Sequence, residues 1–148
     1  MPFVRSSAPW SQDFGQHQNG ARKMTWSSAV PIVAGEKLSP FQAAASVADG
    51  ASLATNWGSG GVEHINTDIT LALARRPVGT EIGLGAIDRV EADGIAVGTV
   101  AVFDRAGPLG NVMVTALANA DKAVDFTRVE YADDGSRRVA PGIDRPVS

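Results

Sequence analysis

The chain has 148 residues, of which 44% are hydrophobic and 20% are charged, enough apolar material for one ordinary core but not for two full domains. Its formal net charge of -3, without a basic cluster, argues against nucleic acid or an anionic membrane as a partner. Because the sequence lacks cysteine and any apolar run long enough for a signal peptide or a membrane span, we expect a cytoplasmic protein without disulfides or thiolate chemistry.

The beginning of the chain is polar and shows no hydrophobic period. We therefore expect residues 1–23 to form a flexible N-terminal segment. Residues 24–33, MTWSSAVPIV, are consistent with an extended segment. Since proline cannot donate a ladder hydrogen bond, Pro31 restricts this segment to a sheet edge or to the end of a strand.

The clearest helix signal begins at Ser39. Ser39 and Gln42 have the spacing of a capping box, in which each side chain satisfies a free backbone amide of the first turn. Pro40 lies at the first helical position, where its missing amide proton costs nothing. Helix-forming residues continue over 41–56, and the glycine-rich stretch 58–61 ends the predicted helix.

Strand-like patterns follow the helix in four runs, at residues 66–74, 80–91, 94–104 and 109–118. Asp93 and Gly94 join the second and third runs and indicate a hairpin, because glycine accepts the positive φ of a tight turn. A helix followed by strands with short turns excludes alternating βαβ winding and predicts an α+β domain over residues 24–119. We expect residues 120–148 to form a C-terminal extension that is partly disordered.

The first of these strands alternates in hydrophobicity. One face carries β-branched and aliphatic side chains, namely Thr67, Ile69, Leu71 and Leu73. The other face carries the polar side chains of Asn66, Asp68 and Thr70. This period of two predicts a half-buried strand.

Two stretches of the sequence, SPFQAAASVADGASLATNW and HINTDITLALARRPVG, are followed by two glycine-punctuated strands. This arrangement resembles the C-terminal hotdog half of the double-hotdog acyl-CoA thioesterases. The matching positions are Ala48-Asp49, then Asn66, Asp68 and Thr70, then residues 75–79 and 104–107. The resemblance implies a hotdog fold, a curved antiparallel sheet wrapped around one long α-helix.

The resemblance also implies a site. In an Ala-rich helix, Asp49 competes for backbone hydrogen bonds and needs some compensating role. By resemblance, Asp49 orients or deprotonates a water that attacks a thioester carbonyl, and Asn66 holds the same water or polarises the carbonyl. The alternatives are a surface aspartate near the end of the helix and a polar strand face turned to solvent.

The sequence departs from the family in two ways. The last strand of the family commonly carries a glutamine that helps to hold the water, and residues 111–115 contain none. Thr115 is the candidate that takes its place. The family also usually carries two hotdogs in one polypeptide, whereas this chain has the length of one. We therefore expect a homodimer or a pairing with a second hotdog domain.

Four residues are candidates for binding the acyl-CoA or acyl-carrier thioester: Trp57, Gly58, Asp68 and Thr70. Each also has a structural interpretation. The glycines after Trp57 can simply end the helix, Trp57 can fill the core, and Asp68 can make structural hydrogen bonds.

Other site classes fit the sequence less well. His64 and Asp68 are four residues apart on a strand, roughly 13 Å, which is too far for the shared proton chemistry of a hydratase. The sequence contains no cluster of metal ligands, and we expect neither a metal nor another cofactor.

Two functions follow from these patterns. The first is an acyl-CoA thioesterase-like hydrolase that cleaves an acyl thioester with a water activated by Asp49. The second is a catalytically silent hotdog that binds an acyl or polycyclic ligand, or that serves as the structural half of a double-hotdog assembly.

Overall fold

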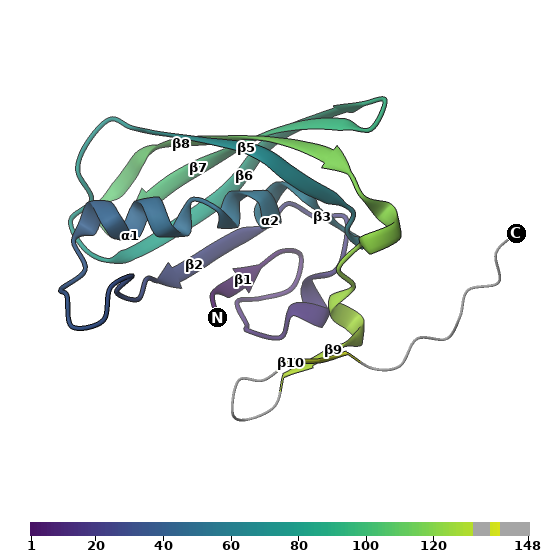
Figure 1. Cartoon of the computed structure of the whole chain (residues 1–148), viewed down its shortest axis with the longest axis horizontal. Helices are drawn as coiled ribbons and strands as arrows, with labels where there is room; N and C mark the ends of the chain where they lie inside the picture. The colour runs from purple at the N-terminus through teal and green to yellow at the C-terminus, as the bar shows by residue number, and fades with distance from the viewer. Residues whose placement is uncertain (132–136, 140–148) are drawn as a thin grey trace, which may run out of the picture.

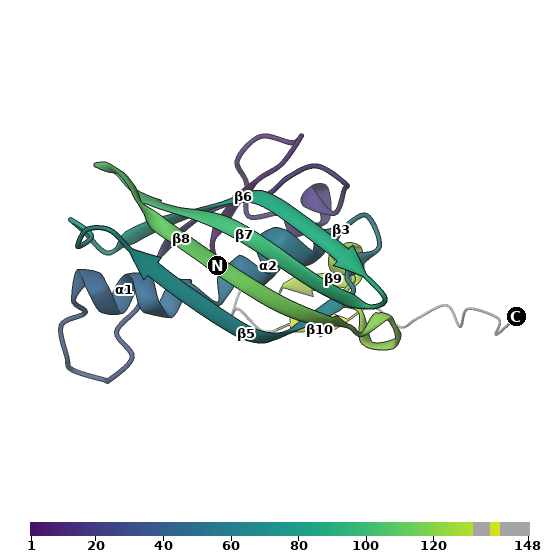
Figure 2. The ribbon, with the colours of Figure 1, turned by 90° about the horizontal axis from the view of Figure 1, so that it is seen from above.

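The structure, a computed structural model, describes residues 1–131 and 137–139, and for residues 130, 131 and 137–139 it describes the backbone alone. Its main sheet has six antiparallel strands in the order β1-β2-β6-β7-β8-β5. In chain order the strands are β1 (Phe3–Arg5), β2 (Met24–Ser28), β5 (His64–Leu73), β6 (Glu81–Ala92), β7 (Ile95–Asp104) and β8 (Gly107–Ala118). Strands β6, β7, β8 and β5 lie side by side above the helix (Figure 2).

One helix, interrupted at Ala48 and Asp49, runs under the curved sheet (Figure 1). Its two parts are α1 (Pro40–Val47) and α2 (Gly50–Asn56). The Ser39 side chain accepts a hydrogen bond from the Gln42 amide at 3.2 Å, and the Gln42 side chain accepts one from the Ser39 amide at 2.9 Å. The predicted capping box is therefore confirmed.

The core lies between the helix and the concave face of the sheet. The helix contributes small buried side chains, those of Ala43, Ala44, Ala48, Ala51 and Ala54. The sheet contributes larger aliphatic ones, those of Ile82, Leu84, Val100, Val102, Leu109, Val112 and Val114. Because alanine lets the two layers approach closely, a strongly curved sheet can wrap the helix, and the predicted α+β hotdog fold is confirmed.

The predicted hairpin between β6 and β7 is also present. Its two turn residues, Asp93 and Gly94, have positive φ angles of 50° and 79°. Ala92 lies directly opposite Ile95, so the turn has only these two residues.

Residues 1–23, predicted as a flexible segment outside the domain, pack against the rest of the fold in the structure. Strand β1 pairs with β2, and β2 pairs with β6, so the segment extends the main sheet. Val4 and Phe14 are buried together with Trp57 in a second apolar cluster. Phe14 belongs to the short 3-10 helix η1 (Phe14–His17).

Buried polar groups explain why the polarity of this segment misled the prediction. Lys23 is 1% exposed, although lysine is almost never buried without partners. Its ammonium donates hydrogen bonds to the carbonyls of Asn19 and Ala21 at 2.6 and 2.7 Å, and it lies 5.6 Å from the centre of the Trp57 ring. The polar composition of this segment therefore includes buried side chains whose hydrogen bonds are satisfied inside the fold.

The segments around the sheet are short. Strands β3 (Trp57–Gly58) and β4 (Gly61–Val62) form a small hairpin, and β9 (Val129–Tyr131) pairs with β10 (Arg137–Val139). The 3-10 helices η2 (Ala120–Lys122) and η3 (Phe126–Arg128) follow β8. The prediction that residues 120–148 are partly disordered falls largely on residues 132–136 and 140–148, which lie outside the described residues.

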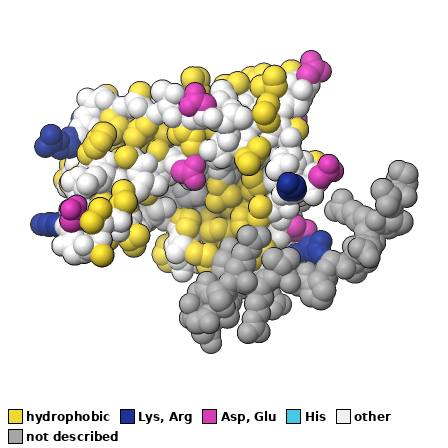
Figure 3. Space-filling view, in the orientation of Figure 1, with side chains coloured by type: hydrophobic (Ala, Val, Ile, Leu, Met, Phe, Trp, Pro, Cys, Tyr) yellow, Lys and Arg dark blue, Asp and Glu magenta, His cyan; other side chains and the backbone are white. Residues whose placement is uncertain are grey.

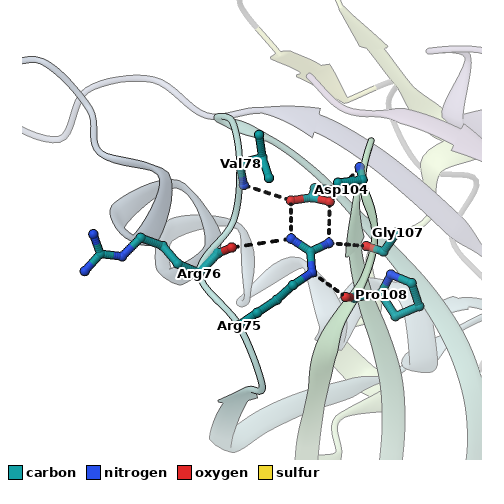
Figure 4. Close-up of polar contacts among 7 residues, drawn as sticks. Arg75, Arg76, Val78, Asp104, Gly107 and Pro108 are labelled. Carbon is teal, nitrogen blue, oxygen red and sulfur yellow. Dashed lines mark hydrogen bonds and ion pairs between the residues drawn. The ribbon is translucent and has the colours of Figure 1, made fainter.

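An ion pair between the partly exposed Arg75 and the buried Asp104 joins the turn after β5 to the turn between β7 and β8 (Figure 4). Arg75 donates two hydrogen bonds to the Asp104 carboxylate, at 2.7 and 3.1 Å. Asp104 also accepts from the Val78 amide at 2.9 Å and from the Ala106 amide at 2.8 Å. Hydrogen bonding from Arg75, followed by these amides, lowers the pKa of Asp104 well below its ordinary value, although burial opposes this shift.

We expect the variant Asp104→Asn to unfold at a temperature several degrees lower than the wild type at pH 7, because the guanidinium of Arg75 loses its charged partner. A carboxyl group with a lowered pKa stabilises the fold above its unfolded pKa and loses this effect as pH falls. The difference between wild type and variant should therefore shrink in thermal unfolding below about pH 4.

The matched control for this experiment is Glu81→Gln, which removes the exposed pair between Glu81 and Arg105. Since exposed ion pairs contribute little to stability, this control should lower the unfolding temperature much less than Asp104→Asn does. Equal effects of the two variants would contradict a structural role specific to Asp104.

His17 predicts a second pH dependence. It is fully buried, and its ring nitrogens lie 3.0 Å from the Ser6 hydroxyl and 2.9 Å from the Ser11 hydroxyl. Burial lowers the pKa of His17; Asp13 opposes this shift and Lys23 adds to it. The unfolded chain therefore binds a proton more readily, and stability should fall as pH drops below about 6.5.

Urea unfolding at pH 7.5 and pH 5.5 measures this effect. We expect the wild type to lose more unfolding free energy between the two pH values than His17→Gln does, because glutamine does not titrate. His64→Gln, in which the half-buried histidine of β5 is replaced, serves as the comparison. If the wild type and His17→Gln lose the same amount, burial of a neutral His17 is not the cause.

Candidate functional site

Strand β5 carries one residue more than its partner β8. Asn66 lies opposite Ala116 and Asp68 lies opposite Thr115, so Thr67 between them has no partner in β8. Such a bulge reverses the alternation of side chains, because the residues before it and after it no longer follow one period of two.

The bulge corrects the alternation predicted from the sequence. Ile69, Leu71 and Leu73 pack against the core as expected. Thr67, which was expected beside them, is exposed instead. Asn66, which was expected on the opposite face, points toward the helix.

On the helix side, Asn66 meets Asp49. The Nδ2 atom of Asn66 donates a hydrogen bond to Oδ1 of Asp49 at 3.3 Å. Asp49 lies at the interruption of the helix, in the N-cap position of α2, yet its side chain makes no capping hydrogen bond. Its exposed carboxylate therefore remains open to Asn66 and to a molecule entering from solvent. The structure thus brings together the two residues that the sequence proposed as partners.

The two side chains line a groove of about 440 Å³. The groove is lined by Asp49, Gly50, Ser52, Leu53, Val62, His64, Ile65, Asn66, Asn119, Lys122, Val124 and Phe126. Its walls come from α2, from the start of β5 and from the segment after β8. Figure 3 shows that hydrophobic side chains gather on the face of the molecule where the helix lies, with only scattered charged groups among them.

The neighbouring strand offers no polar partner on this side. The inward side chains of β8 nearest to Asn66 are those of Val114 and Ala116, each 1% exposed. Thr115 points to the outer face, and its hydroxyl lies 3.0 Å from that of Thr67. The structure therefore does not bring Thr115 to Asp49.

The predicted substrate-binding residues are dispersed. Asp68 and Thr70 are exposed on the outer face of the sheet, away from the groove, because they follow the bulge. Trp57 is 3% exposed, and its ring centre lies 4.7 Å from that of Phe126 and 5.4 Å from that of Phe14. Its place in the second apolar cluster agrees with the structural interpretation.

Gly58 borders a second hollow of about 400 Å³, at the C-terminal end of α2. His64 lines this hollow as well as the groove. Its Nε2 atom lies 3.3 Å from the Glu91 carboxylate, which is also 2.6 Å from the guanidinium of Arg89. Arg89 in turn donates to the Asn56 side chain at 3.2 Å. Hydrogen bonding from Arg89 is the main cause that lowers the pKa of Glu91.

Sequence reasoning missed this cluster and the apolar walls of the groove. His64 and Glu91 are on β5 and β6, which are not neighbours in the sheet, so only the curl around the helix brings them together. Val62 and Val124, which both line the groove, form an isolated antiparallel bridge. The hydrophobic character of Leu53, Val62 and Phe126 was the one available signal, and it does not distinguish a groove from a core.

The model of the family described as "acyl-CoA thioesterase C-terminal domain" matches residues 2–117. No curated protein and no solved structure matches the chain. The match begins ahead of β1, in agreement with an N-terminal segment that is part of the fold. In the described part of the chain, every helix is too short or too polar to cross a membrane.

Proposed function

The chain belongs to the acyl-CoA thioesterase C-terminal domain family, and from this premise we propose that it hydrolyses an acyl thioester at the groove beside Asp49 and Asn66. The hydrogen bond between these two side chains carries the proposal, because it joins a base and an amide donor at the mouth of an apolar groove.

The chemistry requires no covalent intermediate. The oxygen of a water attacks the carbonyl carbon of the thioester while the Asp49 carboxylate accepts the water proton. The Asn66 amide has two hydrogens, so it can hold Asp49 with one and stabilise the developing oxyanion with the other. Collapse of the tetrahedral intermediate breaks the carbon–sulfur bond, and the leaving thiolate takes up the proton.

The lining of the groove favours a thioester substrate whose acyl group is apolar. Leu53, Val62 and Phe126 provide an aliphatic and aromatic surface beside the carboxylate. Burial of an alkyl chain on such a surface contributes roughly 0.8 kcal/mol for each methylene group. We propose acyl-CoA or an acyl-carrier thioester as the substrate class and the cytoplasm as the compartment, since the absence of cysteine fits a reducing environment.

A second domain completes the site in this proposal. Strand β5 is an edge of the main sheet, so its outer row of backbone groups has no partner strand within the described residues. The same strand carries Asn66 and borders the groove. We propose that a second hotdog domain, in the first instance another copy of this chain, pairs with this edge and covers the groove.

The catalytic proposal is tested by measuring the free thiol released from short, medium-length and aromatic acyl-CoAs. We expect Asp49→Asn to lower kcat by about 100-fold or more, because the variant loses the base while keeping the shape of the side chain. The matched control is Asp93→Asn in the β6–β7 turn, where asparagine also tolerates the positive φ. Turnover by Asp49→Asn equal to that of the wild type would eliminate Asp49 as the base.

A silent binding domain is the second candidate, and the inner face of β8 favours it. Val114 and Ala116 occupy the inward positions of β8 nearest to Asn66, so this strand supplies no third polar group to hold the water. Saturable binding of an acyl-CoA by the wild type, without release of thiol from any of the tested thioesters, would select this function over hydrolysis.

The pairing proposal has its own measurement. We expect light scattering at micromolar concentration to give twice the mass of the 15.3 kDa chain. The physical reason is the unpaired edge of β5, which favours strand addition. A monomer at this concentration would contradict self-pairing and would make a separate domain the required partner.

A further inference from the structure

The Thr67 side chain lies on the outer face of the sheet, opposite the groove. Its contacts nevertheless affect the direction of Asn66, which lines the groove. Thr67 is the extra residue of the β5 bulge. Its hydroxyl lies 3.0 Å from the Thr115 hydroxyl and 3.3 Å from the Thr115 carbonyl oxygen. Both contacts can form together, because the Thr67 hydroxyl can donate to the carbonyl while it accepts from the other hydroxyl.

From this arrangement we infer that Thr67 and Thr115 form a clamp that fixes the bulge and thereby holds Asn66 toward Asp49. The catalytic consequence of the clamp rests on the proposed function, whereas its effect on the Asn66–Asp49 contact does not. Thr67 and Thr115 are positioning residues, since neither one lines the groove.

The location of the bulge explains the need for a clamp. Strand β5 is hydrogen-bonded to β8 on one side, and its other side is an edge of the sheet. A bulge in such a strand can move along the strand at the cost of few ladder hydrogen bonds. Displacement of the bulge to the other side of Asn66 would turn this side chain to the outer face, because neighbouring positions face opposite ways.

The apolar residues of β5 do not prevent this displacement. Ile69, Leu71 and Leu73 are inward after the bulge and would remain inward if the bulge moved toward the start of the strand. Core packing therefore fixes the second half of β5 but not the direction of Asn66. The contacts of the Thr67 hydroxyl with Thr115 distinguish the two positions of the bulge, because Thr67 is the extra residue only in the observed one.

The structural test follows the side-chain amide protons of Asn66 by NMR while the solution is taken from neutral to acidic pH. In the wild type we expect these signals to shift with pH, and the same shift should be absent in Asp49→Asn. Thr67→Val keeps the β-branched shape but removes the hydroxyl, so the shift should be lost. Thr67→Ser restores the hydroxyl and should restore the shift.

The kinetic test uses the same variants. We expect Thr67→Val to lower kcat by on the order of 10- to 100-fold with KM nearly unchanged, since a small misplacement of a catalytic group has effects of this size. Thr67→Ser should recover most of the activity. Thr115→Val should have an intermediate effect, because the Thr115 carbonyl remains as an acceptor.

The matched control is Thr99→Val on the outer face of β7, opposite Met113 of β8. It removes a threonine hydroxyl from the same sheet face without touching the bulge, and it should leave both the NMR shift and kcat unchanged. Loss of the shift in Thr99→Val as well would assign the effect to general destabilisation and overturn the inference.

The NMR test and the kinetic test together distinguish failure of the clamp from failure of the proposed function. A pH-dependent Asn66 signal that persists in Thr67→Val contradicts the clamp, whether or not the protein hydrolyses any thioester. If the signal is lost in Thr67→Val and restored in Thr67→Ser while the wild type releases no thiol, the clamp stands and the hydrolytic function fails.

Discussion

The contact between Asn66 and Asp49 depends on one residue of β5 that has no partner in β8. Strand geometry allows a side chain only two directions, so an extra residue is enough to move Asn66 from the solvent face to the helix face. The helix supplies a second irregularity, its interruption at Asp49. The Asp49 carboxylate does not make the capping hydrogen bond that is usual for an N-cap residue, so it is free to meet Asn66. Two local irregularities thus create the site.

The elements that carry these irregularities are packed against the rest of the fold. The alanine side of the helix is packed against the aliphatic face of the sheet, and the Arg75–Asp104 pair fixes the two turns at the far end of β5. At the other end, Trp57 is packed among the rings of Phe14 and Phe126, so the N-terminal segment and the segment after β8 hold the start of β5 together. A site on an edge strand gains its precision from these anchors.

The groove places an apolar wall beside the Asp49 carboxylate. An apolar wall beside an exposed carboxylate suits an acyl group with a polar carbonyl at its end. Strand β8 adds no polar group beside Asn66, since its nearest inward residues are Val114 and Ala116. A second domain over the edge of β5 could exclude water and strengthen the electrostatic effect of the two groups that are present.

Local patterns in the sequence determined the helix, the hairpin turn at Asp93-Gly94 and the extent of the four long strands, because capping boxes, turn chemistry and a period of two act over a few residues. The motif around Asp49 and Asn66 also determined the candidate partners through family resemblance. The sequence did not determine that Asn66 faces inward, since the bulge depends on its register with β8, about fifty residues away along the chain.

Only the tertiary structure decided the remaining features. Residues 1–23 were predicted to be flexible because the segment is polar and has no hydrophobic period, but the burial of His17 and Lys23 depends on partners that the fold supplies. Thr115 read as a possible substitute for a catalytic group, and the pleat of β8 turned it to the opposite face. The sequence specifies local conformation through neighbouring residues, whereas the direction of a side chain in a sheet depends on a distant strand.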